Sequence, residues 1–186
     1  MRIISGKFKG KTLLFIKSKY TRPLKDSVKE NIFNILSHSK DINLSVENAE
    51  VLDMYSGIGS FGLECISREA KNVTFIEKDS EIVKTLTKNL ENLKNSNNAS
   101  IVNSDIKDFI SNVKNKKYDI FFLDPPFVEK DFMEILKILK KNNNYKKKHI
   151  IIIHREKKTE DNFPNFFQTL KIKLYARSKI IFGRFS

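Results

Sequence analysis

Apolar and polar positions follow two alternating periods from residue 50 onward. Short apolar runs rich in β-branched and aromatic residues are followed by longer segments with apolar residues every three or four positions. The short runs predict strands, and the longer segments predict helices. The expected strands cover residues 50–54, 72–77, 99–103, 118–123 and 149–154, and the expected helices cover 60–69, 80–94, 105–113 and 129–141. This alternation is typical of an α/β fold with a mostly parallel sheet and helices on both faces.

The N-terminal part of the chain has a different pattern. Residues 1–16 alternate apolar and polar positions around two glycines, which predicts a small hairpin. Residues 24–36 have apolar side chains at helical spacing, which predicts a helix that packs by one face, with Lys25 and Lys29 elsewhere. Pro23 suits the first turn of that helix.

The polar stretch 37–48 has no clear periodicity and is expected to be a connection. We therefore divide the chain into a basic N-terminal appendage of residues 1–48 and a core of residues 49–186.

Two further segments complete the predicted core. The β-like runs 168–175 and 179–185 predict an antiparallel hairpin at the edge of the sheet. The stretch 140–148 is rich in lysine and asparagine and is expected to be a solvent-facing loop.

The charge balance suggests a class of partner. The chain has 35 Lys plus Arg against 22 Asp plus Glu, a formal net charge of +13. Such a charge attracts polyanions, so nucleic acid is the first partner to consider. A lysine-rich composition also fits simple solvated faces, and charge alone leaves both interpretations open.

Cysteine usage and hydropathy indicate the compartment. Cys65 is the only cysteine, so neither an intramolecular disulfide nor a cysteine-based metal site is possible. The N-terminus lacks the apolar stretch of a signal peptide, and the aliphatic run 150–153 is too short to span a bilayer. We expect a cytoplasmic protein without a metal or a membrane partner.

A glycine turn follows the first predicted strand of the core. Gly57, Gly59 and Gly62 come after Tyr55 and Ser56, and a helix is expected to begin among them. Glycines allow close approach of a ligand to the backbone, and a helix start offers free N–H groups. The turn predicts a nucleoside-cofactor site, although this glycine spacing alone also fits a dinucleotide fold.

Acidic residues at the ends of the next strands refine the predicted cofactor. Glu77, with Lys78 beside it, can accept hydrogen bonds from ribose hydroxyls. Asp53 would repel a pyrophosphate but can hold the ammonium group of a methionine moiety, which favours S-adenosylmethionine over NAD. Asp105 can accept a hydrogen bond from adenine, with Ile106 packing beside the ring. Asp53 could instead cap the turn, Glu77 could be a solvated strand end, and Asp105 could cap a helix.

The tetrapeptide Asp124-Pro125-Pro126-Phe127 follows the apolar run 118–123. The Asp124 carboxylate and the Pro125 carbonyl can accept hydrogens from an exocyclic amine, and Phe127 can stack on a base. Prolines lack N–H groups and stiffen the backbone, which would keep these acceptors in place. Together with the glycine turn, the tetrapeptide predicts methyl transfer to an amine, although Asp-Pro-Pro in isolation is often only a turn.

Taken in order, these residues resemble the RsmD-like family of bacterial 16S ribosomal-RNA guanine-N2 methyltransferases. The resemblance also includes residues 2–11, 21–23, 33–36 and 62–64. It implies a class I methyltransferase fold, S-adenosylmethionine as cofactor, and a guanine in 16S ribosomal RNA or a small-subunit particle as substrate. It further implies that Lys7, Lys9, Lys11 and Arg22 face RNA. The chain departs from the family's pattern at Leu24, Glu69 and His154 to Glu156.

Other functions remain open on the sequence. An amino-methyltransferase acting on DNA bases or protein glutamine holds its amine with hydrogen-bond acceptors in a similar tetrapeptide. A non-catalytic ribosome-assembly protein could retain the fold. An NAD-dependent dehydrogenase would give Asp53 and the tetrapeptide no role. We expect a monomer, with His154 ending a strand at the surface or in a hydrogen bond rather than acting as a general base.

Overall fold

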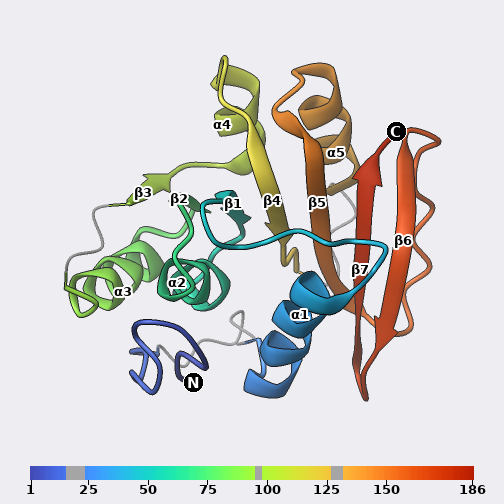
Figure 1. The fold of residues 1–186 in the computed structure, drawn as a ribbon. Coiled ribbons are helices and arrows are strands. Elements are labelled where there is room, and N and C mark those ends of the chain that lie inside the picture. The colour runs from blue at the N-terminus through green and yellow to red at the C-terminus, as the bar shows by residue number, and fades with distance from the viewer. Residues whose placement is uncertain (16–23, 95–97, 127–131) are drawn as a thin grey trace.

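The computed structural model describes residues 1–15, 24–94, 98–126 and 132–186. Within these residues, seven strands form one sheet in the order β3-β2-β1-β4-β5-β7-β6 (Figure 1). The strands are β1 (Glu50–Met54), β2 (Asn72–Glu77), β3 (Ala99–Asn103), β4 (Tyr118–Leu123), β5 (Tyr145–Glu156), β6 (Phe167–Leu174) and β7 (Ser178–Phe185). The strands β1 to β5 run parallel, and β7 is antiparallel to both β5 and β6. The predicted α/β fold with a C-terminal antiparallel hairpin is confirmed.

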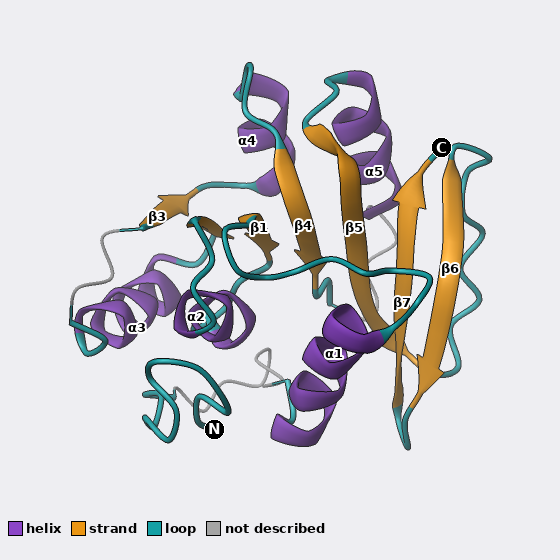
Figure 2. Cartoon of the chain, viewed as in Figure 1, coloured by secondary structure: helices purple, strands orange, loops and turns teal. Residues whose placement is uncertain are grey.

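Helices cover both faces of this sheet (Figure 2). They are α1 (Asp26–His38), α2 (Ser60–Ser67), α3 (Ser80–Glu91), α4 (Ile106–Asn112) and α5 (Phe132–Lys141). Successive residues of β4 point to opposite faces. Ile120 and Phe122 pack in one apolar cluster with α1, α2 and α3, whereas Phe121 and Leu123 pack in a second cluster with α4 and α5.

The start of β5 corrects the predicted loop at 140–148. The strand begins at Tyr145, which pairs with Tyr118, and the register then shifts so that the next pair is Ile150 with Ile120. This irregular stretch places three lysines in the strand while leaving two of them exposed. The lysine-rich composition predicted a loop because Lys147 and Lys148 remain in solvent, although the backbone forms a strand.

The N-terminal hairpin is less regular than predicted. Among the described residues, its two arms share a single antiparallel bridge, between Arg2 and Thr12. Pro23 lies outside the described residues, and α1 begins at Asp26. The apolar side chains of the segment, such as Ile3 and Phe8, join the cluster that covers one face of the sheet. The division of the chain at residue 48 stays a prediction.

The prediction that Lys29 lies away from the buried face is wrong. Its side chain is 0% exposed, because polar groups of α2 and the N-terminal segment surround its ammonium group, as described below. Among the described helices, none is long and apolar enough to cross a bilayer. The predicted location in the cell stays a prediction.

Candidate active site

Two carboxylates predicted to act at the site lie at the same edge of the sheet. Because β1 and β4 are parallel neighbours, Asp53 pairs with Phe122, and Met54 pairs with Leu123. Asp124 follows directly, and its backbone N–H donates to the Met54 carbonyl at 3.5 Å. The carboxyl ends of parallel strands are where open α/β folds bind ligands.

The glycine turn has a left-handed backbone at three of its residues. Tyr55, Gly57 and Gly59 have φ values of 59°, 55° and 88°, in the left-handed region that favours glycine. Ser56 anchors the turn to β2, since both its N–H (3.0 Å) and its hydroxyl (3.2 Å) donate to the Ile76 carbonyl. The turn is thereby fixed against the neighbouring strand.

Two of these glycines have different surroundings. A Cβ at Gly57 would meet no atom within 4 Å, whereas a Cβ at Gly59 would lie 2.4 Å from Leu86 Cδ1. Gly57 therefore borders open space that a ligand can enter. Gly59 allows the turn to pack closely on α3.

Glu77 braces the same turn from the end of β2. One carboxylate oxygen accepts from the Gly57 N–H at 3.0 Å, and the other accepts from the Asp79 N–H at 2.9 Å. Asn103, which sequence reasoning missed, donates to the carbonyls of Glu77 and Lys78 at 2.9 and 3.0 Å. Asn103 is the last residue of β3, and a polar residue at the carboxyl end of a predicted parallel strand could have indicated this role.

Asp53 is the most buried carboxylate at this edge, with 1% exposure. Its Oδ2 accepts from the Gly62 N–H at 2.9 Å, so the predicted cap on the turn is present. Within the described part of the chain, its Oδ1 is buried without a hydrogen-bond partner. Burial raises the pKa of Asp53 well above its usual value, with the Gly62 bond opposing the shift and the charges of Asp124 and Glu77 adding to it.

Asp105 adopts the capping role that the sequence left open. It is the N-cap of α4, where its Oδ1 accepts from the Lys107 N–H at 2.8 Å. Its side chain is exposed, whereas Ile106 beside it is buried. The hydrogen bond from adenine to Asp105 and the contact with Ile106 stay predictions.

The Asp-Pro-Pro segment is held by the end of β5. Asp124 Oδ1 lies 2.9 Å from His154 Nδ1, and Arg155 Nη1 donates to the Pro126 carbonyl at 3.4 Å. Of the expected environments for His154, the hydrogen bond is the one found, although the strand continues to Glu156. Phe127 lies outside the described residues.

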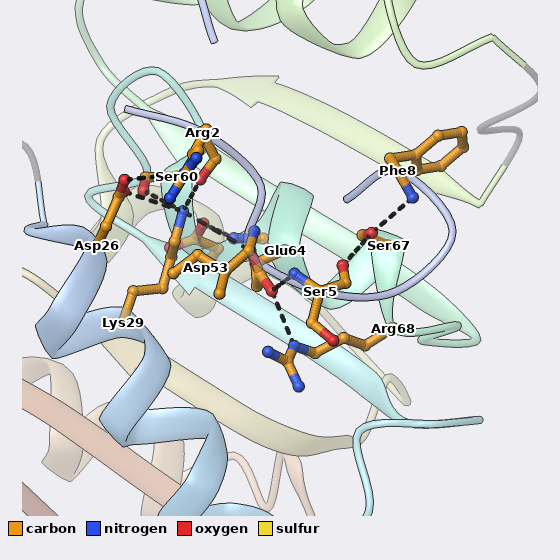
Figure 3. A network of polar contacts seen from close by, with 12 residues as sticks. Arg2, Ser5, Phe8, Asp26, Lys29, Asp53, Ser60, Glu64, Ser67 and Arg68 are labelled. Atoms are coloured by element: carbon orange, nitrogen blue, oxygen red, sulfur yellow. Dashed lines mark hydrogen bonds and ion pairs between the residues drawn. The ribbon is translucent and has the colours of Figure 1, made fainter. Parts of the chain in front are cut away.

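A buried polar network joins the N-terminal segment to α2, the helix that follows the glycine turn (Figure 3). Glu64 of α2 is 0% exposed. Its carboxylate accepts from the backbone N–H groups of Ile4 and Ser5 at 2.8 and 3.0 Å. It also accepts from Arg68 Nε at 2.9 Å and lies 3.7 Å from Lys29 Nζ.

The same network includes the first residue of α2. Lys29 Nζ donates to the Arg2 carbonyl at 2.7 Å and to Ser60 Oγ at 3.5 Å. Burial lowers the pKa of Lys29, while the negative charges of Glu64 and Asp26 oppose that shift. The helical spacing of the apolar residues gives no sign that this lysine is buried, because its partners lie in other segments of the chain.

Ser67 and Asn89 also tie the segment to the core. Ser67 Oγ accepts from the Phe8 N–H at 2.9 Å, and a Cβ at Gly6 would lie 1.8 Å from the Ser67 carbonyl oxygen. Asn89 of α3 accepts from the Leu14 N–H at 2.7 Å and donates to the Ile58 carbonyl, inside the glycine turn, at 3.1 Å. The appendage is therefore packed directly against the elements that carry the turn.

A family model described as "Conserved hypothetical protein 95" matches residues 1–184. The chain belongs to this family. Ribosomal RNA small subunit methyltransferase D of Haemophilus influenzae is 40% identical over 129 residues, which cover 68% of this chain and 64% of that protein. The chain thus matches slightly less than two thirds of that relative's length. The protein of the same name from Escherichia coli K12 is 37% identical over 142 residues, covering 76% of this chain and 68% of that protein.

Two solved structures of similar sequence have the same fold. A structure described as a putative methyltransferase yhhF from Escherichia coli has a TM-score of 0.84 and 30% identity, covering 100% of this chain and 97% of that chain. A putative methylase from Haemophilus influenzae has a TM-score of 0.78 and 33% identity, covering 98% and 96%. The predicted RsmD-like resemblance and class I methyltransferase fold are both confirmed.

The residues at the sheet edge fit S-adenosylmethionine, the predicted cofactor, and a structure of similar fold, described as the putative methyltransferase SMU.776, contains SAH. The unpartnered Oδ1 of Asp53 suits an ammonium group, since a buried carboxylate oxygen without a donor is unfavourable until a cation reaches it. The open space beside Gly57 leaves room for a ligand against the backbone. Which atoms each predicted cofactor residue contacts stays a prediction.

The three N-terminal lysines that the family resemblance assigns to RNA form an exposed basic surface. Lys7, Lys9 and Lys11 are exposed, and the ammonium groups of Lys7 and Lys11 lie 5.6 and 5.4 Å from the centre of the Phe8 ring. Lys11 also donates to the Asn92 carbonyl at 2.8 Å, at the end of α3. Arg22 lies outside the described residues.

Proposed function

We propose that this protein transfers a methyl group from S-adenosylmethionine to the exocyclic N2 amine of a guanine in the RNA of the small ribosomal subunit, during subunit maturation. The relatives named above support an RNA substrate. The observation that carries the proposal is the placement of Asp124, at the end of β4, beside Asp53 and the glycine turn at the end of β1.

The cofactor would be held by groups from the ends of three strands. The Asp53 carboxylate would bind the ammonium group of its methionine moiety, Glu77 would bind ribose hydroxyls, and Asp105 with Ile106 would contact adenine. When bound, S-adenosylmethionine supplies a methyl group activated by a positively charged sulfur. Placing this group next to Asp124 converts methyl transfer into a reaction between oriented partners.

The chain's own task is to prepare the amine. The lone pair of an exocyclic amine is delocalised into the ring, which makes the nitrogen a poor nucleophile. The Asp124 carboxylate and the Pro125 carbonyl accept the two amine hydrogens, which favours a pyramidal nitrogen whose lone pair points at the methyl group. Pro125 and Pro126 restrict the backbone, so both acceptors hold their positions during the transfer. The transfer would break the bond between sulfur and methyl and leave S-adenosyl-L-homocysteine as the second product. The methylated nitrogen is acidic and would lose its proton to water.

The RNA would be recognised through charge and shape. A net charge of +13 and the exposed lysines near the N-terminus favour contact with phosphates. Side chains cannot read the deep major groove of a duplex RNA, so the target guanine must be unstacked or turned out into the site.

The direct test is transfer of radiolabelled methyl from S-adenosylmethionine to small-subunit RNA or particles that lack the modification, followed by nucleoside analysis. N2-methylguanosine is the expected product. Label in DNA or in protein glutamine, with none in RNA, would replace the proposed substrate. Cofactor binding without transfer to any of these would favour a non-catalytic role.

Asp124→Ala tests the role of the carboxylate. We expect transfer to fall by a factor on the order of 100 to 1000, the effect of removing one preorganised transition-state contact, with little change in cofactor affinity. The matched control is Asp119→Ala, which removes a carboxylate at the opposite end of the same strand that accepts from the Glu50 N–H at 2.8 Å. Near-normal turnover of Asp124→Ala would eliminate this mechanism.

A further inference from the structure

The register of the sheet places His154 beside Asp124. Leu123, the last residue of β4, pairs with Ile153 of β5. Asp124, which follows β4, and His154 of β5 therefore lie side by side at this edge. Their Oδ1 and Nδ1 atoms are 2.9 Å apart, and His154 is 8% exposed.

The chemistry of the pair fixes the direction of this hydrogen bond. An ionised carboxylate can only accept, so the imidazole Nδ1 carries the hydrogen and donates it to Asp124. With Oδ1 engaged by His154, the bond restricts rotation of the carboxylate and leaves Oδ2 as its other acceptor atom. A carboxylate without this donor could rotate about its side-chain torsions, since Asp124 remains 22% exposed.

The next residue of β5 holds the other end of the same segment. Arg155 is 2% exposed, and its Nη1 donates to the Pro126 carbonyl at 3.4 Å. Its Nε donates in turn to Asp161 Oδ1 at 3.1 Å, and Asp161 Oδ2 lies 2.9 Å from Lys179 Nζ. Two consecutive residues of β5 thus contact both ends of the Asp-Pro-Pro segment.

We propose that His154 is a positioning residue for methyl transfer, which orients the Asp124 carboxylate so that its second oxygen and the Pro125 carbonyl meet the amine hydrogens together. This inference rests on the proposed function. His154 forms no bond to the substrate and accepts no proton from it. Its effect lies in the geometry of the transition state, because small misplacements of a reacting group reduce rates strongly.

Two variants separate positioning from packing. His154→Asn retains an N–H donor close to the position of Nδ1, whereas His154→Leu retains bulk but no donor. For His154→Leu we expect kcat to fall by a factor on the order of 100, while the KM for RNA and the Kd for S-adenosylmethionine change less than about threefold. His154→Asn should recover at least about one tenth of the wild-type kcat, because a donor again meets Oδ1.

The matched control lies on the same strand. His149 is 7% exposed, its Nδ1 contacts the Lys146 carbonyl, and its Nε2 accepts from the Phe185 N–H. His154 lies five positions further along the strand, about 16 Å away. His149→Leu should lower stability as much as His154→Leu but leave kcat within about twofold of wild type.

Several outcomes would overturn the inference. These are a wild-type kcat for His154→Leu, equal losses for the leucine and asparagine variants, or a loss confined to KM or cofactor affinity.

A readout without turnover separates this inference from the proposed function. Nitrogen NMR should show Nδ1 of His154 protonated and its signal shifted by Asp124→Leu; an unprotonated Nδ1 would refute the pairing even in an active enzyme. An Nδ1–H signal with no methyl transfer by the wild type would overturn the proposed function and, with it, the positioning role.

Discussion

Replacing Glu64 by glutamine tests whether the buried network holds the N-terminal segment against the core. The amide has one acceptor oxygen, so it can serve either Ile4 or the pair of Ser5 and Arg68, but not both sides as the carboxylate does. It also removes the charge 3.7 Å from Lys29, whose side chain is 0% exposed. The remaining acid near Lys29 is Asp26, at 4.0 Å and 41% exposed.

The expected loss follows from this arrangement. Removing one partner of a buried ion pair typically costs roughly 3–5 kcal/mol, and leaving a buried backbone N–H unsatisfied costs roughly 1–3 kcal/mol. The two effects overlap at one side chain, so we expect Glu64→Gln to lower the free energy of unfolding by about 4 kcal/mol. That is a large share of the roughly 5–15 kcal/mol typical of a domain.

Urea unfolding followed by far-ultraviolet circular dichroism measures this change, with a lower midpoint and an unchanged m-value expected. Amide hydrogen exchange should accelerate at Ile4 and Ser5 before the sheet exchanges. The control is Glu81→Gln, which removes a solvent-exposed ion pair with Lys84 at 2.7 Å and should cost less than about 1 kcal/mol. The prediction is refuted if the unfolding free energies of Glu64→Gln and Glu81→Gln differ by less than about 1 kcal/mol.

Two further predictions concern the cofactor and the RNA. The raised pKa of Asp53 means that its folded form keeps a proton that the unfolded chain has lost above about pH 4. The free energy of unfolding should therefore fall as pH rises from about 4 toward the pKa of Asp53 in the folded protein. Asp53→Asn should reduce this fall, raise the free energy of unfolding at neutral pH and weaken S-adenosylmethionine binding. Urea unfolding at several pH values and calorimetry measure these two effects, and a steeper fall in the variant would contradict the prediction. Replacing Lys7, Lys9 and Lys11 together by glutamine should weaken RNA binding and reduce the slope of log affinity against log salt by about 3 if each contacts a phosphate. Filter binding across salt concentrations measures this slope, and an unchanged slope would remove these lysines from the interface.

The sheet could be predicted because its signals are local. Apolar runs bounded by a turn or a helix start mark most of the parallel part, and that pattern indicates the existence and order of the elements along the chain. The beginning of β5 was missed because it forms a strand by pairing with the backbone of β4, whereas the three lysines at 146–148 are typical of a surface loop. Pairing across the sheet is a tertiary property that composition does not encode.

The candidate site was predicted in part for the same reason. Asp53, Asp124 and the glycines stand in recognisable local sequences, and their common edge follows from parallel strands. Lys29 and His154 could not be assigned, because each depends on a partner at least 30 residues away, Glu64 and Asp124. A side chain's partner across that distance is decided by the register of the fold.

The N-terminal segment has its partners far along the chain, and this orders events during synthesis. The Ile4 N–H can donate only after Glu64 has been synthesised, and Lys11 can donate only after Asn92, 81 residues later, has been synthesised. At roughly 5–20 residues per second, a ribosome needs about 4–16 seconds to add those residues. The basic segment is translated before α2 and α3, so these contacts stay unmade for seconds, and it reaches its folded position only after both helices have been made.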